Sequence, residues 1–425
     1  MAGAVRQLRP AAKRMAHQAS ASPAAPDAFP ALPLGSMLAV QTLVSLAALA
    51  VPAIAPAVAA GTGLPVALVG LFTAGIYAGA MFSALHAGGP LVRFGALRVS
   101  QACLCVTACG LLLVASGSLA ALLPGAVLTG IGYGAATPTS SHLFAHEVPA
   151  RWRGLVFSIK QTGVPLGGML AGALLPSAAQ RLGWRGALPL LALACVACAA
   201  LLQPLRARFD GARERGQRLA FGGSLRTLRM VWNHVAVRRL AIATFFFASM
   251  QSCMATYLVA QAHEGAGLGL VRAGLVLACA QVSGVFGRIA WGWLGDHWVR
   301  PSRLLALLAL GMGACACAAA LLRPGWPMPA VLALAVAFGA TATGWNGVYL
   351  AEVARLAPAG MAGILTGGTL FFTFAGALSA PPAFAVVATI THGLGHGYLA
   401  VGLVLLGIGA WMLRRQARRV ATPAG

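Results

Sequence analysis

The apolar residues of this chain come in long unbroken runs, separated by short gaps that are rich in glycine, proline and arginine. An α-helix needs about 20 apolar residues in a row to cross a bilayer, and these runs reach that length. Only 9% of the 425 residues are charged, whereas about 25% is usual in soluble domains. The sequence therefore predicts an all-α polytopic membrane protein.

Division of the chain at these gaps predicts twelve transmembrane helices in two sets of six. The expected spans are 37–60, 64–86, 98–117, 119–144, 154–176 and 186–204, followed by 239–262, 271–294, 303–322, 329–352, 362–388 and 397–413. This division implies five parts: a disordered basic cytoplasmic tail at 1–36, an N-terminal six-helix bundle at 37–204, a cytoplasmic linker at 205–238, a C-terminal six-helix bundle at 239–413 and a second cytoplasmic tail at 414–425.

The basic residues are distributed unevenly between the two sides of this arrangement. If both termini are cytoplasmic, 24 lysines and arginines lie in cytoplasmic segments and four lie in outer loops, while Lys160 and Arg288 fall within spans. Cytoplasmic segments of membrane proteins carry such an excess. The net charge of +23 does not indicate a nucleic-acid partner, because the arginines lie between apolar runs and not on a soluble basic face.

Two glycine-containing segments at equivalent places indicate an internal duplication. After the eighth span, GRIAWGWLGDHWVRPSR (287–303) contains Gly292, then Asp296, then basic residues. After the second span, GGPLVRFG contains Gly88 and Arg93, but Val92 stands where an acidic residue is expected. These two segments are about 204 residues apart. A second pair with equal spacing, Pro149–Gly154 and Pro358–Gly363, is 209 residues apart, which is a similar offset. Duplicated six-helix units are typical of secondary transporters.

With PARWRG (149–154) at the start of the fifth span, these segments resemble signatures of the major facilitator superfamily, over the chain from 37 to 413. The resemblance implies a bacterial inner-membrane secondary transporter, in which two pseudo-symmetric six-helix bundles rock about a central site. It implies a small-molecule substrate, no cofactor and a monomer in the lipid bilayer. The 28 arginines against two lysines also suggest a GC-rich bacterial genome.

A set of residues near the expected cytoplasmic ends is assigned to gating. A carboxylate beside helix ends can accept from unpaired N–H groups, and in this superfamily that contact is expected between the two halves. We therefore expect Asp296 to reach the start of the fifth span near Gly154, with Arg288 beside it; alternatively, Asp296 only caps its own turn. The gating candidates are Asp296, Arg288, Gly292, Gly88, Arg93, Glu147 and Glu352.

Lys160 is a charged residue placed inside the apolar segment LVFSIKQTGVPLGGMLAG. It lies six residues into the fifth span, about 9 Å along the helix axis, so its stem could reach back to the headgroups. On a helical wheel, however, it shares a stripe with Val164, Gly167 and Ala171, and small residues allow close helix packing. A cavity-facing lysine attracts anions, so Lys160 is the leading candidate for binding an anionic substrate.

Further polar and aromatic residues inside spans are candidates for the substrate site. Trp345 and Tyr349 lie on one face of the tenth span, with Asn346 to one side. The full set of binding candidates is Lys160, Gln161, Trp345, Asn346, Tyr349, Tyr133, Thr137, Gln41, Gln251 and Tyr257. No catalytic or metal site is expected, because the nine cysteines fall in apolar runs, and the CxxC at 195–198 has no partner ligands nearby.

Two functional alternatives remain open at this stage. Gly154, Gly163 and Gly167 have the spacing of the glycine signature of drug–proton antiporters, but Gly168 replaces its proline and Pro165 comes early. No carboxylate lies in the middle of any span, so proton coupling is unsupported, and anion exchange or potential-driven transport remains open, with protons or a counter-anion as partners. A membrane enzyme or a sensor is the second alternative, but the loops contain no catalytic cluster.

Overall fold

The structure is a computed structural model that describes residues 29–211, 224–356 and 362–421. These described residues are almost entirely helical and contain no β-strand. Eleven helical stretches among them are long and apolar enough to cross a membrane. One of these, Arg151–Leu201, has 51 residues, about 75 Å of helix against a bilayer core of about 30 Å. It therefore accounts for two crossings, which makes twelve.

A backbone break at Gly183 separates these two crossings. α9 (Ala150–Gln161) leads into α10 (Gly163–Leu201), and inside α10 Gly183 has φ 72° and ψ 158°. Residues with a Cβ rarely adopt a positive φ, whereas glycine does so readily. The fifth and sixth spans thus follow the predicted division, although helix continues on both sides of the turn between them.

The rest of the N-terminal bundle follows the predicted order. Its first span is divided at Leu49 and Ile54, near Pro52 and Pro56, because proline removes a backbone donor and disturbs the helix. Its elements are α2 (Ala31–Ala48), α3 (Ala50–Ala53), α4 (Ala55–Thr62), the 3₁₀ turn η1 (Val66–Leu68), α5 (Val69–His86), α6 (Gly88–Phe94), α7 (Ala96–Ala115) and α8 (Leu119–Glu147).

The linker and the C-terminal bundle supply the remaining helices. Two short helices, α11 (Arg206–Phe209) and α12 (Ser224–Asn233), lie in the predicted linker. The spans that follow are α13 (Val235–Glu264), α14 (Leu270–His297), α15 (Pro301–Ala320), α16 (Met328–Leu356), α17 (Ala362–Ile390) and α18 (Leu394–Ala421).

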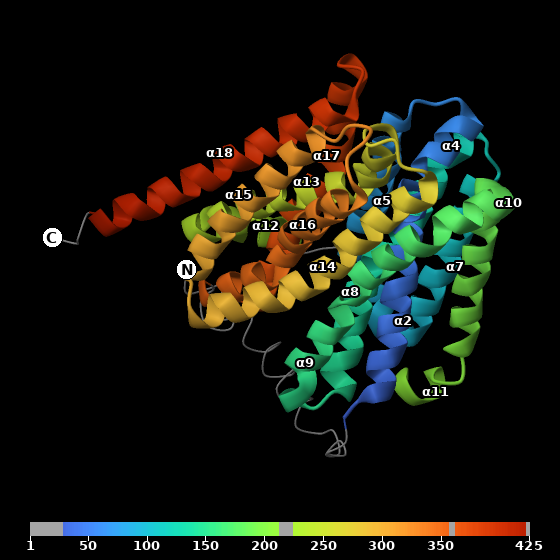
Figure 1. Cartoon of the computed structure of the whole chain (residues 1–425). Helices are drawn as coiled ribbons and strands as arrows, with labels where there is room; N and C mark the ends of the chain where they lie inside the picture. The colour runs from blue at the N-terminus through green and yellow to red at the C-terminus, as the bar shows by residue number, and fades with distance from the viewer. Residues whose placement is uncertain (1–28, 212–223, 357–361, 422–425) are drawn as a thin grey trace.

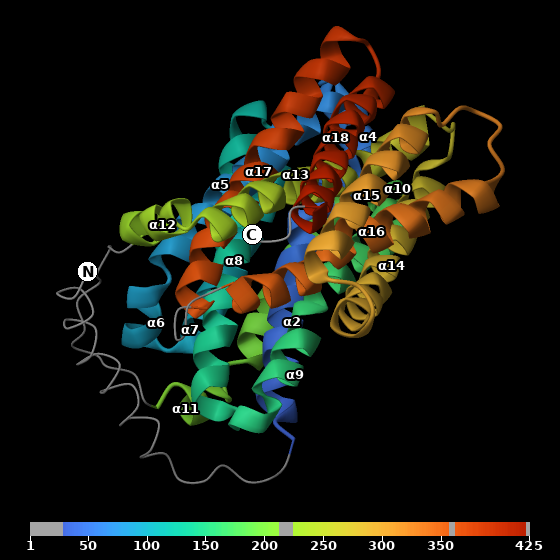
Figure 2. The ribbon, with the colours of Figure 1, turned by 90° about the vertical axis from the view of Figure 1, so that its left-hand side faces the viewer.

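The two halves form two bundles that lie side by side (Figures 1 and 2). α6, α9, α11 and α12 lie at the end that we call the arginine-rich end (α6 is labelled in Figure 2), and the turn between α17 and α18 lies at the opposite end (Figure 1). α5 packs along α17 and α10 packs along α14, so the interface between the bundles is formed by α5 and α10 of the first bundle and α14 and α17 of the second. In Figure 1 the bundles diverge toward the arginine-rich end.

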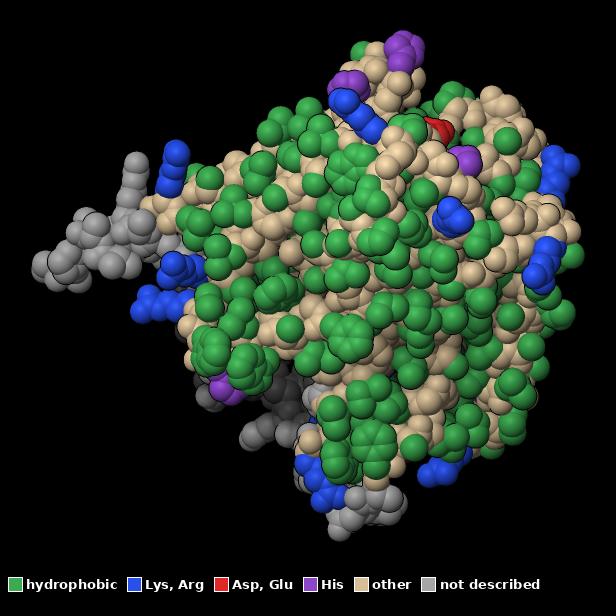
Figure 3. Space-filling model, in the orientation of Figure 1, with side chains coloured by type: hydrophobic (Ala, Val, Ile, Leu, Met, Phe, Trp, Pro, Cys, Tyr) green, Lys and Arg blue, Asp and Glu red, His purple; other side chains and the backbone are tan. Residues whose placement is uncertain are grey.

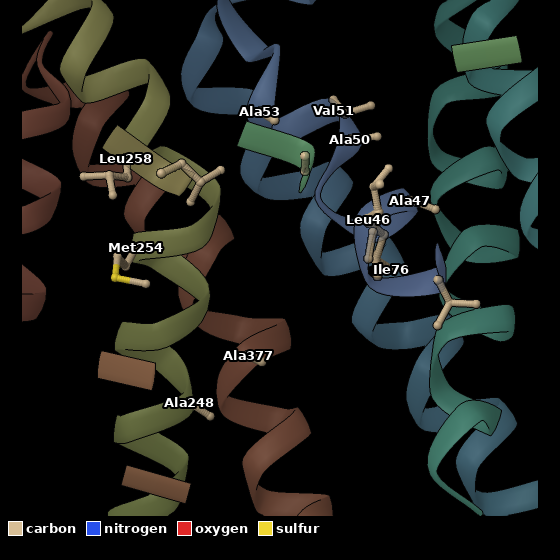
Figure 4. Close-up of a cluster of buried hydrophobic side chains, with 14 of the residues drawn as sticks. Leu46, Ala47, Ala50, Val51, Ala53, Ile76, Ala248, Met254, Leu258 and Ala377 are labelled. Carbon is tan, nitrogen blue, oxygen red and sulfur yellow. The ribbon is translucent and has the colours of Figure 1, made fainter. Parts of the chain in front are cut away.

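Apolar side chains cover the outer face shown in Figure 3, with lysine and arginine at its margins. Inside, small side chains allow helices to approach closely. Figure 4 shows Ala47 and Ala50 of α2 and α3 in the buried cluster, and Ala377 of α17 facing α13. This distribution fits a chain whose outer surface meets lipid.

Some predicted boundaries are wrong by several residues. The first helix begins at Ala31, inside the predicted tail, and α18 extends to Ala421, past the predicted end at 413. The eighth span is predicted to end at 294, yet residues up to His297 belong to α14. The reason is that no proline occurs there before Pro301, which starts α15, and the helix continues through Gly292 and Gly295.

Candidate functional site

Lys160 is completely buried inside the N-terminal bundle, with 0% of its surface exposed. Its Nζ donates to Gln41 Oε1 of α2 at 2.6 Å, to Gln161 Oε1 at 3.2 Å and to Thr137 Oγ1 of α8 at 3.4 Å. A side chain held in this way does not reach the headgroups, so the snorkelling alternative is wrong for this conformation. Four of the predicted binding residues thus meet at one ammonium group.

The small residues after Lys160 explain how Gln41 comes to lie beside it. A Cβ added at Gly167 would lie 2.5 Å from Thr42 O, and one at Gly163 would lie 3.0 Å from the Gln41 side chain. Real Cβ atoms do not approach backbone oxygens so closely, so glycine is needed at 167 for α10 to pack on α2. The stripe that contains Lys160 therefore faces protein, as the wheel predicts.

Pro165 leaves one backbone acceptor free at the same place. A helical residue normally donates its N–H to the carbonyl four positions earlier, and proline has no N–H to donate. The acceptor left without this donor is Gln161 O, where α9 ends and α10 begins. Arg288 of α14 donates from Nη1 to this oxygen at 3.2 Å, and from Nε to Thr343 O at 3.1 Å.

Two cationic side chains, one from each bundle, therefore converge on Gln161. Lys160 bonds to its side chain, and Arg288 bonds to its carbonyl. Among the described residues, neither cation takes part in an ion pair. Charges inside a membrane protein are costly without a partner, so this arrangement suits an anion.

A cavity of about 40 Å³ lies between the bundles, and its lining residues do not include Lys160, Gln161 or Arg288. Val164, one helical turn beyond Lys160, is part of its wall. Polar groups from both bundles line the rest, including Ser45, Thr73, Tyr77, Tyr133, Gln251 and Gln281. The rings of Tyr77 and Tyr133 meet edge to face, with centroids 6.3 Å apart. This mixture offers hydroxyl, amide and aromatic contacts to a small polar molecule.

A second hydrogen-bonded cluster, in the C-terminal bundle, reaches the cavity wall through Gln251 alone. Gln251 of α13 accepts from Trp345 Nε1 at 3.0 Å and from Asn346 Nδ2 at 3.4 Å, both of α16. Trp345 is fully buried, so its indole is fixed in place. The structure thus brings these three predicted binding residues together, with Gln251 at the cavity wall.

The two remaining tyrosines predicted for the site lie elsewhere. Tyr349 is buried and donates to Thr369 of α17, outside the cavity wall. Tyr257 lies toward the opposite end, where its hydroxyl is within bonding distance of Pro381 O at 2.7 Å and Ala67 O at 3.0 Å. Neither tyrosine is among the residues that line the cavity, so their role in binding stays a prediction.

Tyr257 is part of a seal between the bundles at the opposite end. Ala67 belongs to η1 of the first bundle, whereas Tyr257 and Pro381 belong to the second. Thr73 of α5 and Thr256 of α13 add a hydroxyl–hydroxyl bond of 3.1 Å across the same interface. A Cβ at Gly70 would lie 2.0 Å from the Tyr257 hydroxyl. The cavity is therefore closed toward this end.

The predicted gating residues lie at or near the arginine-rich end. Gly292 and Asp296 are in the last turns of α14, and the Asp296 side chain lies outside the described part of the structure, so its expected contact near Gly154 remains a prediction. Gly88 starts α6, where Arg93 is exposed, and Glu147 ends α8.

Two of the gating candidates have partners that the structure describes. Glu352, 4% exposed, pairs with Arg355 of its own helix at 2.6 Å. Arg288, expected beside Asp296, is bonded to the two carbonyls of Gln161 and Thr343. Glu352 is buried and Arg288 is half-buried, and each bonds to an acceptor or counter-charge within reach.

Sequence reasoning missed several residues that the structure places at functional positions. Tyr77, Thr73 and Gln281 line the cavity, and the only signal for them was a polar group within a span. Asp210 was assigned to the linker, yet its carboxylate accepts from the backbone N–H groups of Leu97 and Arg98, both at 3.0 Å. Asp210 thus places a carboxylate at the start of α7, near the segment where Val92 replaces the expected acidic residue.

Comparison with known proteins gives a family-level result. The model of the Major Facilitator Superfamily matches residues 37–381. A gallate transporter of Pseudomonas putida is 31% identical over 44% of this chain and 48% of its own length. Monocarboxylate transporter 13 of Rattus norvegicus is 27% identical over 66% of this chain and 63% of its own length. The chain thus matches only about half to just under two-thirds of these relatives' lengths.

Solved structures confirm the fold. A peptide transporter POT in complex with sulfate superposes with a TM-score of 0.75, at 16% identity, covering 95% of this chain and 98% of that one. A bacterial homologue of the human lysosomal transporter Spinster, in an inward-facing and unoccupied conformation, gives 0.68 at 16% identity, covering 91% and 96%. The chain belongs to the Major Facilitator Superfamily, and it shares the multi-pass helical fold of these two solved structures.

Proposed function

We propose that this chain transports small organic anions, and that the anion is held between Lys160 and Arg288. The observation that carries the proposal is the meeting of these two cations, one from each bundle, at Gln161 without an acidic partner among the described residues. A carboxylate placed between them would gain two charge-assisted hydrogen bonds. The gallate and monocarboxylate relatives fit this chemistry, since both substrate names denote carboxylates.

The cavity wall is proposed to contact the rest of the substrate. The rings of Tyr77 and Tyr133 can pack against an apolar or aromatic body, and Gln251 and Ser45 can bond to its polar groups. At about 40 Å³ the cavity holds only a few water-sized groups. Binding of a whole organic anion therefore requires the bundles to separate, as rocking about the central site would allow.

We further propose that the arginine-rich end faces the bacterial cytoplasm, so that both termini are cytoplasmic. The 24-to-4 division of basic residues supports this orientation. The seal formed by Tyr257 and Thr73 then closes the outer side. In this arrangement the gating role of Asp296, Gly292, Gly88 and Arg93 is to hold the inner side shut when the bundles rock the other way.

Uptake of labelled anions into proteoliposomes tests the proposal. We expect uptake of at least one of gallate, benzoate and lactate, and a loss of at least about tenfold, or 1.4 kcal/mol, in Lys160→Gln and in Arg288→Gln. Arg323→Gln removes the same charge from a loop at the opposite end and is the matched control. Uptake of no anion, or equal uptake by all variants, would contradict the proposal.

The drug–proton antiporter alternative rests on the glycine spacing in the fifth span. Gly163 and Gly167 pack α10 closely on α2, so helix packing already accounts for two of those glycines. Proton-driven efflux of a cationic dye, unaffected by Lys160→Gln, would favour this alternative over anion transport.

A further inference from the structure

The charged side chains inside the two bundles near the cavity, Lys160 and Arg288, are both positive. The chain has seven acidic residues, and none lies in the middle of a span. They are Asp27, Glu147, Asp210, Glu214, Glu264, Asp296 and Glu352. The nearest along α14 is Asp296, eight residues beyond Arg288, or about 12 Å along the axis. Lys160 and Arg288 therefore have no acidic residue at their own depth.

Building on the proposed function, we propose that this transporter is an obligatory anion exchanger. It moves one organic anion across the membrane only in return for another anion of the same class moving the opposite way. The bundles would reorient readily with an anion in the site and slowly without one. Net transport, which needs the empty protein to reorient, would then be the slow process.

The physical reason is the cost of closing an empty cationic site. When the bundles rock, the site passes through a form that is shut on both sides, and water leaves the interface. Lys160 is already fully buried and bonds to neutral oxygens only, at Gln41, Gln161 and Thr137. An uncompensated charge in such surroundings costs several kcal/mol. A bound carboxylate supplies the missing negative charge and removes most of that cost.

Because the two cations lie at the interface between the bundles, the cost of burying them without an anion falls on the movement of the bundles. Lys160 belongs to the first bundle and Arg288 to the second, and both are bonded to Gln161. Their mutual repulsion therefore opposes the approach of the two bundles at this point. An anion that bridges them converts the repulsion into attraction. A carrier with an internal carboxylate at this depth would not need the exchanged anion.

The test compares exchange with net uptake in the same proteoliposomes. The probe is whichever of labelled gallate, benzoate and lactate gives the highest uptake. Vesicles preloaded with the unlabelled probe should take up label at least about tenfold faster than vesicles without it. One-for-one exchange of like anions is electroneutral, so a valinomycin-imposed potassium potential should leave the exchange rate unchanged.

A single substitution can supply the missing negative charge. Gln41 Oε1 lies 2.6 Å from Lys160 Nζ, so Gln41→Glu places a carboxylate beside the ammonium with little change in shape. We expect the ratio of exchange to net uptake to fall from at least about tenfold to about one. Gln101→Glu is the matched control, because Gln101 is also buried in the first bundle but bonds to Ala199 O and Gln203.

The outcomes separate the two proposals. A high ratio that Gln41→Glu lowers and Gln101→Glu does not supports obligatory exchange. Equal exchange and net uptake in the unaltered protein overturns obligatory exchange but leaves anion transport standing. A high ratio that Gln41→Glu does not lower overturns the role given to the unpaired charge. Absence of uptake in both modes, for every probe, overturns anion transport itself.

Discussion

At the scale of single residues, the site depends on a carbonyl that a proline leaves free. Pro165 cannot donate to Gln161 O, and Arg288 occupies that oxygen from the other bundle at 3.2 Å. The same glutamine accepts from Lys160 through its side chain. One residue thereby contacts both cations, and Pro165, four positions later, leaves its backbone acceptor without a helical N–H donor.

This gives a prediction for Pro165→Ala. The new N–H would compete with Arg288 for Gln161 O, so the guanidinium would be less well positioned for an anion. We expect a three- to tenfold loss of anion affinity, or about 0.7–1.4 kcal/mol, measured by titration calorimetry. Pro189→Ala, in the second half of α10, is the control and should bind normally. Full affinity in Pro165→Ala would show that the free carbonyl has no part in positioning Arg288.

At the scale of helices, the seal at the opposite end makes a separate prediction. Tyr257→Phe keeps the ring stacked on Phe384, with centroids 4.0 Å apart, but removes the hydroxyl that bonds across the bundles. Loss of one such bond, about 0.5–1.5 kcal/mol, should open this end more often. We expect faster hydrogen–deuterium exchange in η1 and the first turns of α5.

The chain offers a control within the same aromatic cluster. Tyr398 packs edge to face on Phe384, at 5.0 Å between centroids, and its buried hydroxyl has no hydrogen-bond partner among the described residues. Tyr398→Phe should therefore leave exchange in η1 unchanged. Identical exchange in the Tyr257 and Tyr398 variants would argue against a seal at Tyr257.

Helix order could be predicted from the sequence because the bilayer fixes the length of each apolar run. The helical end of α14 could not be predicted, since the two glycines and the polar residues of GWLGDH resemble a loop although no proline interrupts them. Hydrogen-bond partners that are far apart in the sequence could not be predicted either. Lys160 and Gln41 are 119 residues apart, Arg288 and Gln161 are 127 apart, and the carboxylate at the start of α7 comes from Asp210. Helical periodicity gives the face of a helix, whereas the fold decides what that face meets.

At the scale of the whole molecule, the central claim is that one anion bridges the two bundles through Lys160 and Arg288. Titration calorimetry of the detergent-solubilised protein with gallate, benzoate and lactate tests it most directly. The account predicts that at least one of these anions binds, and that Lys160→Gln and Arg288→Gln each weaken binding by at least about tenfold, or 1.4 kcal/mol. Arg323→Gln should bind as the unaltered protein does. If both site variants bind every anion as tightly as the unaltered protein, the claim is contradicted.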